Sequence, residues 1–224
     1  MNDRVERSIQ TFIKNLTGVE VEEIRRFIGE ITSNKEFYKG LDEKRGSSSR
    51  RRFSSSGPSI GLTLGVVLYA VCRKVRPATV VETGVASGVS SSFILQSLED
   101  NKSGALYSID LPLWEREVGW IIPDYLRHRW HLIMGQSSDR LLPLLEKVGT
   151  IDVFLHDSEH SYENMLWEYQ TAWSRLKKGG ILLSHNIDAN DAFSDFCQKV
   201  DSQSFVLTNL GGIIKGGLKV KECW

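Results

Sequence analysis

The stretch VVETGVASGVSSSF, residues 80–93, decides how the rest of the chain is interpreted. It opens on two valines, and β-branched residues favour a strand. Gly84 permits a tight turn, and Gly88 lets the backbone approach a ligand where the next helix begins. The exposed N–H groups at such a helix start favour an anion. This order of strand, glycine turn and helix predicts a β–α unit with a ligand at its turn.

Apolar β-branched runs alternate with amphipathic segments through the rest of the chain. The expected strands are Thr79–Glu82, Leu106–Ile109, His131–Met134, Asp152–Leu155, Ile181–Ser184 and Phe205–Thr208, with a last one near Ile213–Lys215. The expected helices cover residues 61–75, 88–99, 138–147, 161–176 and 190–200. Such alternation with short connections predicts an α/β fold, a doubly wound, mostly parallel seven-stranded sheet with helices on both faces.

The first part of the chain has a different pattern. Residues 4–16 and 20–31 carry apolar side chains at helical spacing, with Asp3 as a candidate cap. The segment KRGSSSRRRFSSSG, residues 44–57, is basic and serine-rich and predicts a mobile loop. We interpret it as a solvated linker rather than an Arg cluster for an anion or membrane surface. We therefore divide the chain into residues 1–57, helices and a loop that cover the substrate, and residues 58–224, the ligand-binding domain.

The composition excludes several classes of protein. Lys and Arg number 28, as do Asp and Glu, so the formal net charge is zero, which argues against a nucleic-acid binder. Cys72, Cys197 and Cys223 are scattered without metal or redox spacing, which is typical of a reducing compartment. The N-terminus lacks the pattern of a signal peptide, and the apolar run at residues 60–72 is too short to span a bilayer. We expect a cytoplasmic protein without a membrane partner.

Polar residues follow each of the first five expected strands. Ligands of doubly wound sheets bind outside the carboxyl ends of the strands, so these residues should share one rim. They are Glu82–Gly84, Asp110, Gly135–Ser137, His156–His160 and His185–Asn186. Their alignment predicts a single site built from five strand ends.

The glycine loop does not fit a dinucleotide fingerprint, because Ala86 and Val89 stand where glycines would be needed. Its E-x-G-x-x-x-G spacing, from Glu82 to Gly88, resembles motif I of class I S-adenosylmethionine-dependent methyltransferases, which implies a Rossmann-like fold and S-adenosylmethionine as cofactor. Asp110 ends the second strand, where an acid can accept both hydroxyls of a ribose, although a turn or helix-cap Asp has the same position.

The family segment equivalent to Gly135-Gln136-Ser137 is often Gly-Asp-Ser and contacts adenine. Here Gln136 replaces the acid, and its amide carbonyl can still accept that hydrogen bond. The resemblance implies a set of cofactor contacts, which are Glu82, Gly84, Ala86, Ser87, Gly88, Asp110, Leu111, Gly135, Gln136, Ser137 and Asp157.

The densest cluster is IDVFLHDSEHSYENMLWEY, residues 151–169. Its D-x-x-H-x-Y element, with LKKGGILLSHN and Asp191-Ala192-Phe193 further on, resembles small-molecule O-methyltransferases of the methyltransferase-24 type, which include macrolide-sugar methyltransferases. The resemblance covers roughly residues 64–200. It implies that Asp157 coordinates a divalent metal and that His160 is the general base. A histidine titrates near working pH and can remove a hydroxyl proton, and a metal can lower the pKa of that hydroxyl.

The fifth strand departs from the family pattern. The family commonly ends it with Asp-Asp or Asp-Asn, whereas this chain has His185-Asn186, followed by Asp188. Magnesium prefers oxygen ligands, and a histidine suits a transition metal better. A metal held by Asp157, His185 and Asn186 and a site without metal both remain open, because His185 has the alternative reading of a loop residue.

Other histidines and aromatic residues have two interpretations each. His156 can close its strand through a backbone hydrogen bond, and His131 is more simply structural. The segment at residues 111–132 is rich in aromatics that can line a pocket or fill the core, namely Trp114, Trp120, Tyr125 and Trp130. Trp167 and Trp173 share a helix at helical spacing, which favours core packing.

The residues favour O-methylation of a small hydroxylated molecule such as a sugar or secondary metabolite. A nitrogen acceptor is the first alternative, although no Asn-Pro-Pro-Tyr-like element follows the fourth strand. The second alternative is a catalytically inactive cofactor-binding regulator or partner protein. The expected partner is a small-molecule acceptor, and a homo-oligomer remains open.

Overall fold

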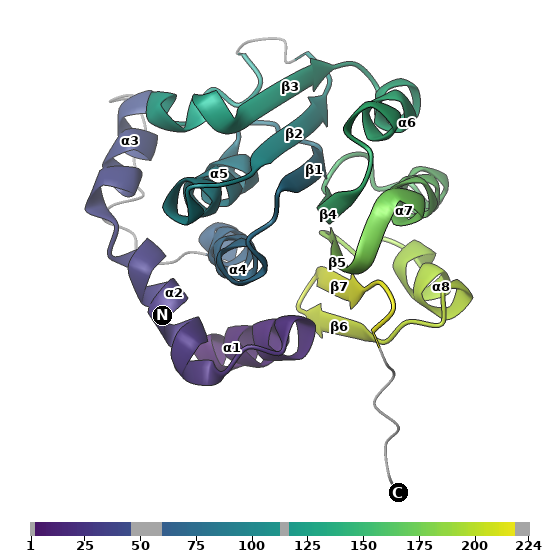
Figure 1. The fold of residues 1–224 in the computed structure, drawn as a ribbon, viewed down its shortest axis with the longest axis horizontal. Helices are drawn as coiled ribbons and strands as arrows, with labels where there is room; N and C mark the ends of the chain where they lie inside the picture. Colours follow the sequence, from purple (N-terminus) through teal and green to yellow (C-terminus); the bar gives the residue numbers. More distant parts are fainter. Residues whose placement is uncertain (1–2, 46–59, 113–116, 218–224) are drawn as a thin grey trace, which may run out of the picture.

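The computed structural model describes residues 3–45, 60–112 and 117–217. Its centre is a seven-stranded sheet in the order β3-β2-β1-β4-β5-β7-β6 (Figure 1). The strands are β1 Thr79–Thr83, β2 Ala105–Asp110, β3 Trp130–Met134, β4 Ile151–His156, β5 Leu176–Ser184, β6 Ser204–Leu207 and β7 Leu210–Ile214. The helices are α1 Asp3–Thr17, α2 Val21–Thr32, α3 Lys35–Arg45, α4 Ile60–Val75, α5 Val89–Asn101, α6 Ser137–Val148, α7 Tyr162–Arg175 and α8 Ala192–Lys199, with a 3₁₀ helix at Asp124–Arg129.

The sheet reverses its strand order between β1 and β4. From β1 the chain builds outward through β2 to β3, and it then returns to place β4 on the other side of β1. These strands and β5 pair in parallel, whereas β7 is antiparallel to both β5 and β6. A crevice forms at such a switch point, because the loops after the two neighbouring strands leave in opposite directions. The loops after Thr83 and His156 border this crevice.

Helices cover both faces of the sheet, because successive strand residues point to opposite sides. In β1, Val80 packs into a core shared with α4 and α5, whereas Val81 packs into a core shared with α6, α7 and α8. Figure 1 shows the two helical layers on either side of the strands. The predicted doubly wound, mostly parallel seven-stranded sheet is thereby confirmed.

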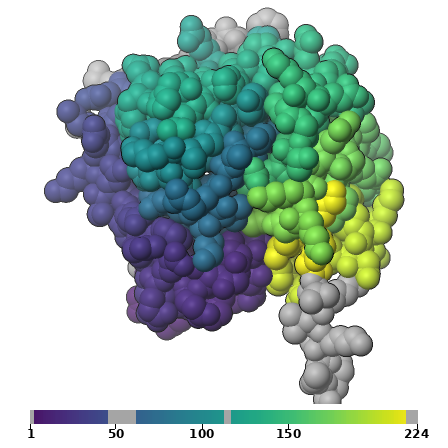
Figure 2. All heavy atoms as spheres, viewed as in Figure 1, coloured from purple at the N-terminus to yellow at the C-terminus, as the bar shows by residue number. Residues whose placement is uncertain are grey.

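The N-terminal helices belong to the first of these cores. Ile9 of α1, Ile24 of α2 and Phe37 of α3 are fully buried in the same cluster as residues of α4 and α5. In Figure 2 the purple atoms of these helices adjoin the yellow atoms of the C-terminal strands. Residues 3–45 thus form a helical layer that packs against the core on one face of the sheet.

Several element boundaries differ from the sequence prediction. Helix α1 includes Asp3, so this residue lies in the first turn instead of capping it. The predicted loop at 44–57 is wrong for its first two residues, because α3 continues through Arg45 and Lys44 pairs with Asp124 at 2.6 Å. Residues 46–57 lie outside the described part.

The third difference concerns β5. This strand begins at Leu176, five residues before the predicted start, because Leu176 already pairs with Ile151 of β4. Its next residues, Lys177 to Gly179, are exposed, which removes the apolar signal of a strand. In the described ranges, no helix is both long and apolar enough to cross a membrane.

Candidate active site

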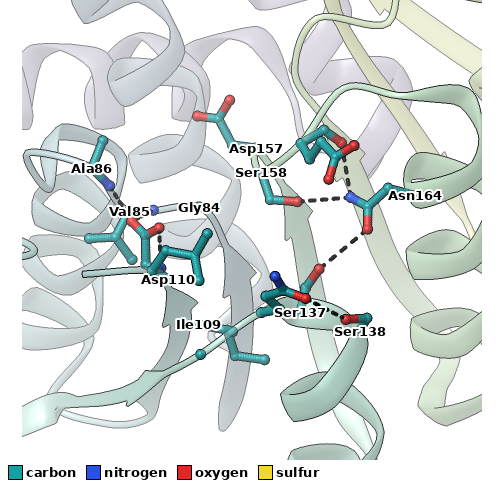
Figure 3. Close-up of a pocket in the computed structure, with 14 residues that line it drawn as sticks. Gly84, Val85, Ala86, Ile109, Asp110, Ser137, Ser138, Asp157, Ser158 and Asn164 are labelled. Carbon is teal, nitrogen blue, oxygen red and sulfur yellow. Dashed lines mark hydrogen bonds between the residues drawn. The ribbon is translucent and has the colours of Figure 1, made fainter. Parts of the chain in front are cut away.

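A cavity of about 400 Å³ lies at the carboxyl ends of β1, β2, β3 and β4 (Figure 3). It occupies the switch point of the sheet, where the topology predicts a ligand. Most of the predicted cofactor contacts line it, namely Gly84, Ala86, Asp110, Leu111, Gly135, Gln136, Ser137 and Asp157. Val85, Ile109, Ser138, Ser158, Glu159 and Asn164 complete the lining. Residues from four of the five predicted strand ends therefore line one pocket, whereas His185, after the fifth strand, does not line it.

Two glycines shape the loop above this pocket. Gly84 has a φ of +83°, and a Cβ there would lie 1.9 Å from the carbonyl oxygen of Asp157. Gly88 has a φ of +95°, and its Cβ would lie 2.9 Å from the Cα of Gly119. Only glycine combines this backbone conformation with such close approach. The loop thus passes directly against the chain that follows β4.

Asp110 holds the glycine loop from below. One of its carboxylate oxygens accepts the N–H groups of Val85 and Ala86, at 2.9 and 2.7 Å, and the other accepts the N–H of Leu111 at 2.7 Å. A carboxylate offers about four acceptor positions, so about one is left for a ribose hydroxyl. Asp110 therefore orders the loop as well as facing the pocket.

Glu82 lies beneath the pocket and outside its lining. Its carboxylate is completely buried and accepts hydrogen bonds from Ser90, Ser91 and Ser108 at 2.6 to 2.9 Å. Burial raises the pKa of Glu82 to about 7, against the opposing effect of the three serine hydroxyls. This geometry ties β1 to β2 and to the first turn of α5. Ser87 and Gly88 also lie outside the lining of the pocket.

A second buried carboxylate, Glu168 of α7, was not predicted. It accepts hydrogen bonds from Thr83 of β1, from His156 Nδ1 at 2.7 Å and from Ser158 at 2.7 Å. The partner of the His156 ring is therefore this carboxylate, and the predicted closure of the strand by a backbone hydrogen bond is wrong for the side chain. Burial raises the pKa of Glu168, but the interactions with His156 and the hydrogen bonds from hydroxyl groups together outweigh it, and the net shift is downward. The carboxylate thus fixes the ends of β1 and β4.

We expect Glu168→Gln to lower the free energy of unfolding by about 3 kcal/mol, because the new amide nitrogen cannot accept the donors that converge on the carboxylate. It should also weaken binding of S-adenosylmethionine, since Ser158 lines the pocket. Thermal denaturation and calorimetry measure the two effects. The matched control is Glu163→Gln, at an exposed site in the first turn of the same helix. Equal effects of the two variants would refute this role of Glu168.

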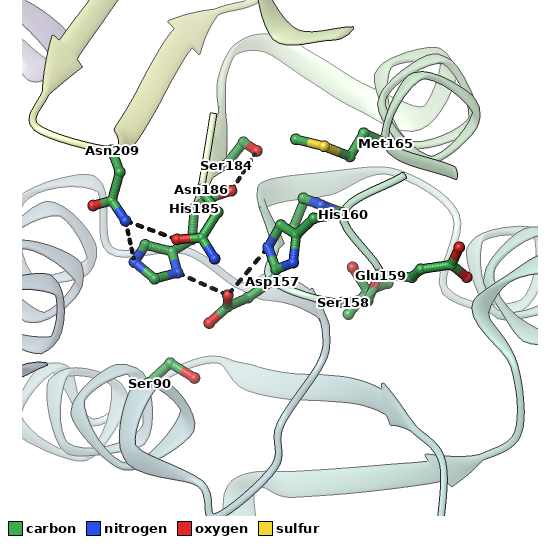
Figure 4. Close-up of polar contacts among 12 residues, drawn as sticks. Ser90, Asp157, Ser158, Glu159, His160, Met165, Ser184, His185, Asn186 and Asn209 are labelled. Atoms are coloured by element: carbon green, nitrogen blue, oxygen red, sulfur yellow. Dashed lines mark hydrogen bonds and ion pairs between the residues drawn. The ribbon is translucent and has the colours of Figure 1, made fainter. Parts of the chain in front are cut away.

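Asp157, His160 and His185 form a polar cluster beside the pocket (Figure 4). His185 Nδ1 lies 2.9 Å from Asp157 Oδ1, a hydrogen bond that raises the pKa of His185. His160 Nε2 lies 3.8 Å from the same oxygen, which is too long for a hydrogen bond. That nitrogen is buried and has no hydrogen-bond partner among the described residues. Burial lowers the pKa of His160, with a further contribution from His156.

The predicted metal ligand Asn186 and the ring of His185 share one partner, Asn209. Asn186 Oδ1 accepts a hydrogen bond from Asn209 Nδ2 at 2.7 Å, and the same amide lies 3.2 Å from His185 Nε2. The ligand atoms of Asp157, His160 and His185, by contrast, lie within 4.8 Å of one another. One carboxylate and two imidazoles suit a transition metal better than Mg²⁺. The cluster therefore adds His160 to the predicted donors Asp157 and His185, and the metal role of Asn186 stays a prediction.

A second cavity, of about 1510 Å³, lies on the other side of this cluster. Helix α1, the first turn of α4, the β6–β7 hairpin and the residues after β5 line it. His185 is part of its wall, whereas Asp157 is part of the wall of the first cavity. The hydrogen bond between these two side chains therefore joins a wall residue of one cavity to a wall residue of the other.

The structure places His131 and the predicted pocket aromatics that it describes outside this cluster. His131 is exposed on β3 and stacks on Tyr107, with ring centroids 4.6 Å apart. Trp120 and Trp130 pack against the first core, and neither lines the described cavities. Tyr125 donates to Gln96. Trp114 lies outside the described residues. Packing against the second core confirms the structural reading of the two tryptophans of α7, Trp167 and Trp173.

Comparison with protein families gives a match over the strands that build the first cavity. Residues 81–187 match the model of a family described as a methyltransferase domain of the methyltransferase-24 type, just under half of the chain. No curated protein matches the sequence at a significant level.

Solved structures share the fold at low sequence identity. The O-methyltransferase from Bacillus cereus in complex with SAH is 14% identical, with a TM-score of 0.60 over 91% of this chain and 100% of that chain. The O-methyltransferase TomG from Streptomyces achromogenes, in complex with SAM, is 16% identical, with a TM-score of 0.59 over 85% and 95%. Podospora anserina methyltransferase PaMTH1, bound to SAH, is 14% identical, with a TM-score of 0.58 over 81% and 88%. Residues 81–187 thus match a methyltransferase domain, and the chain shares the fold of these methyltransferase structures.

Proposed function

We propose that this chain is an S-adenosylmethionine-dependent methyltransferase that transfers the methyl group to a hydroxyl of a small molecule. The carrying observation is the contact between Asp157 of the first cavity and His185 of the second. A methyl transferase must hold donor and acceptor in line on two sides of the reacting atoms. Two cavities that meet at a carboxylate–imidazole pair provide this arrangement. The O-methyltransferases among the structures of the same fold support oxygen as the acceptor atom.

The first cavity is the proposed cofactor site. S-adenosylmethionine supplies the methyl group, which moves by in-line displacement at its sulfonium carbon. The remaining acceptor position of Asp110 would take a ribose hydroxyl, and the Gln136 amide would take the adenine amino group. Gly84 lets the loop lie close enough for these contacts. Asp157 closes the cavity on the side of the acceptor.

His160 is the proposed general base, with Asp157 as its partner. Its lowered pKa favours the neutral imidazole, and its buried Nε2 has no hydrogen-bond partner among the described residues. A neutral imidazole can remove the hydroxyl proton as the oxygen attacks. The resulting cation would be stabilised by Asp157, whose carboxylate lies 3.8 Å away. A small movement of the His160 side chain or of the acceptor would bring Nε2 within hydrogen-bond distance of the acceptor hydroxyl.

A divalent cation held by Asp157, His160 and His185 is the alternative route to the same product. It would supply Lewis acidity that lowers the pKa of the acceptor hydroxyl. The donor set fits such an ion, as does the Nε2 of His160, which has no hydrogen-bond partner in the part of the chain that the structure describes. In that case His160 is a ligand, and its removal abolishes metal binding together with turnover.

The test is a methyl-transfer assay on a panel of hydroxylated small molecules and their amine analogues, with the product read by mass spectrometry. We expect methylated hydroxyl products, and a loss of about 100-fold or more in rate in His160→Ala. If turnover survives EDTA, His160 is the general base that removes the hydroxyl proton. If EDTA abolishes turnover and Mn²⁺ restores it, the cluster holds a metal. Methylation of the amines alone would contradict the proposal. An absence of turnover in a sample that binds S-adenosylmethionine would favour a cofactor-binding module.

A further inference from the structure

The second cavity has an apolar body. Phe12 of α1, Leu64 of α4 and Leu207 of β6 contribute to its wall. Val5 and Val206, two further wall residues, are exposed by 41% and 58%. The free energy falls when a ligand removes apolar side chains of this size from water. The volume of about 1510 Å³ exceeds that of an ordinary drug-sized pocket, roughly 300–1,000 Å³. The cavity therefore suits a ligand with an extended apolar part.

One edge of the cavity carries positive charge. Arg4 and Arg7, three residues apart on α1, both line it and therefore share one face of the helix. Arg7 is exposed. Asp188, after β5, is the one carboxylate in the wall formed by the described residues. Guanidinium groups bind carboxylate and phosphate oxygens through two parallel hydrogen bonds. The α1 edge thus offers the complement of an anionic group.

We propose that this cavity binds an acceptor with an extended apolar body and an anionic group, which pairs with Arg7 and Arg4. The inference rests on the proposed function, because the hydroxyl to be methylated must reach the cluster of Asp157, His160 and His185, of which His185 lines the cavity. The anionic group then fixes which end of the acceptor enters. Helix α1 selects the acceptor, and the strand ends provide the chemistry.

Two fluorescent dyes test this assignment. 8-Anilinonaphthalene-1-sulfonate is an apolar anion, and N-phenyl-1-naphthylamine has the same rings without the sulfonate. Each is titrated into the full chain with saturating SAH, so that the first cavity is occupied. We expect the anionic dye to bind at least about five-fold more tightly than the neutral dye, in keeping with a partly exposed ion pair.

Variants separate charge from shape. The double variant Arg4→Ala/Arg7→Ala should lower the affinity for the anionic dye by about five-fold and leave the affinity for the neutral dye unchanged. Thr11→Trp, which adds bulk to the same wall, should weaken both dyes. The matched control is Arg25→Ala, at an exposed arginine of α2 that lines neither cavity, and it should change neither affinity.

Three results would overturn the proposal. The first is equal affinity for the two dyes, and the second is an equal loss of both dyes in the double variant. The third is binding of neither dye by a chain that light scattering shows to be dimeric, since a second copy then covers the cavity. Calorimetry with SAH distinguishes a failure of the proposed cofactor site from a failure of this inference. Absence of SAH binding refutes the cofactor site, whereas SAH binding without a preference for the anionic dye refutes this inference alone.

Discussion

Gly84→Ala is expected to abolish binding of S-adenosylmethionine and to lower the free energy of unfolding by about 4 kcal/mol or more. A Cβ at this position would lie 1.9 Å from the carbonyl oxygen of Asp157 and 2.8 Å from the N atom of Ser158. Both are backbone atoms that cannot rotate away. The loop would have to retreat from the end of β4, which breaks the wall of the cofactor cavity. Thermal denaturation and calorimetry on the folded fraction measure the two effects.

A control variant at a second glycine distinguishes the effect of the steric clash from that of the left-handed backbone conformation. Gly18 follows α1 with a φ of +68°, and a Cβ there would meet nothing within 4 Å. Gly18→Ala should therefore cost only the strain of a left-handed residue, about 1–2 kcal/mol, with cofactor binding unchanged. Equal destabilisation by the two variants, or normal cofactor affinity in Gly84→Ala, would contradict the proposed packing of the loop.

Asp157→Asn is expected to lower kcat by about 100-fold or more. The substitution keeps the size of the side chain but removes the charge that faces two imidazoles, at 2.9 Å from His185 Nδ1 and 3.8 Å from His160 Nε2. The protonated His160, or a bound metal ion, would then lack the carboxylate that stabilises its positive charge. Affinity for S-adenosylmethionine should change much less, because the other walls of its cavity are intact. Steady-state kinetics and calorimetry report these two quantities separately.

The control for this variant is Glu159→Gln. Glu159 lines the same cavity and is exposed, and Figure 4 shows its side chain pointing away from Asp157 and His185. The loss of this charge should leave kcat within about two-fold, as is usual for a surface group away from the reacting atoms. A comparable loss of kcat in both variants would mean that general electrostatics, not the Asp157 contact, governs the rate.

The sequence predicted the sheet well because its strands are local signals. Runs such as Val80-Val81 and Leu182-Leu183 are buried on both faces and are therefore continuously apolar. Ligand-facing residues then follow from topology, since parallel strands present their carboxyl ends at one edge. This argument placed Gly84, Asp110 and Asp157 in one cavity.

Side-chain partners were less accessible from the sequence. Glu82 was predicted to contact the cofactor, but whether a carboxylate faces a ligand or three serines depends on the opposite strand and helix. Glu168 carried a usable signal, because a charged residue on the buried stripe of α7 needs a partner. Asn209, from a distant hairpin, had no local signal for its contact with His185. The cofactor role of Glu82 stays a prediction.

The second cavity depends on still longer-range contacts. It forms where α1, near one end of the chain, meets the β6–β7 hairpin near the other. No local pattern pairs Arg7 with Val206. The expectation that the N-terminal region covers the acceptor was general, and only the packing of α1 turns it into a cavity with stated charge and apolar walls.

The most direct test of the cofactor site is calorimetry of the full chain with S-adenosylmethionine and, separately, with NAD. We expect one molecule of S-adenosylmethionine per chain to bind, with weaker binding in Asp110→Ala, because that variant releases the N–H groups of Val85 and Ala86 from their acceptor. NAD should not bind, since the glycine loop lacks the dinucleotide spacing. A folded chain that binds NAD and fails to bind S-adenosylmethionine would contradict this account.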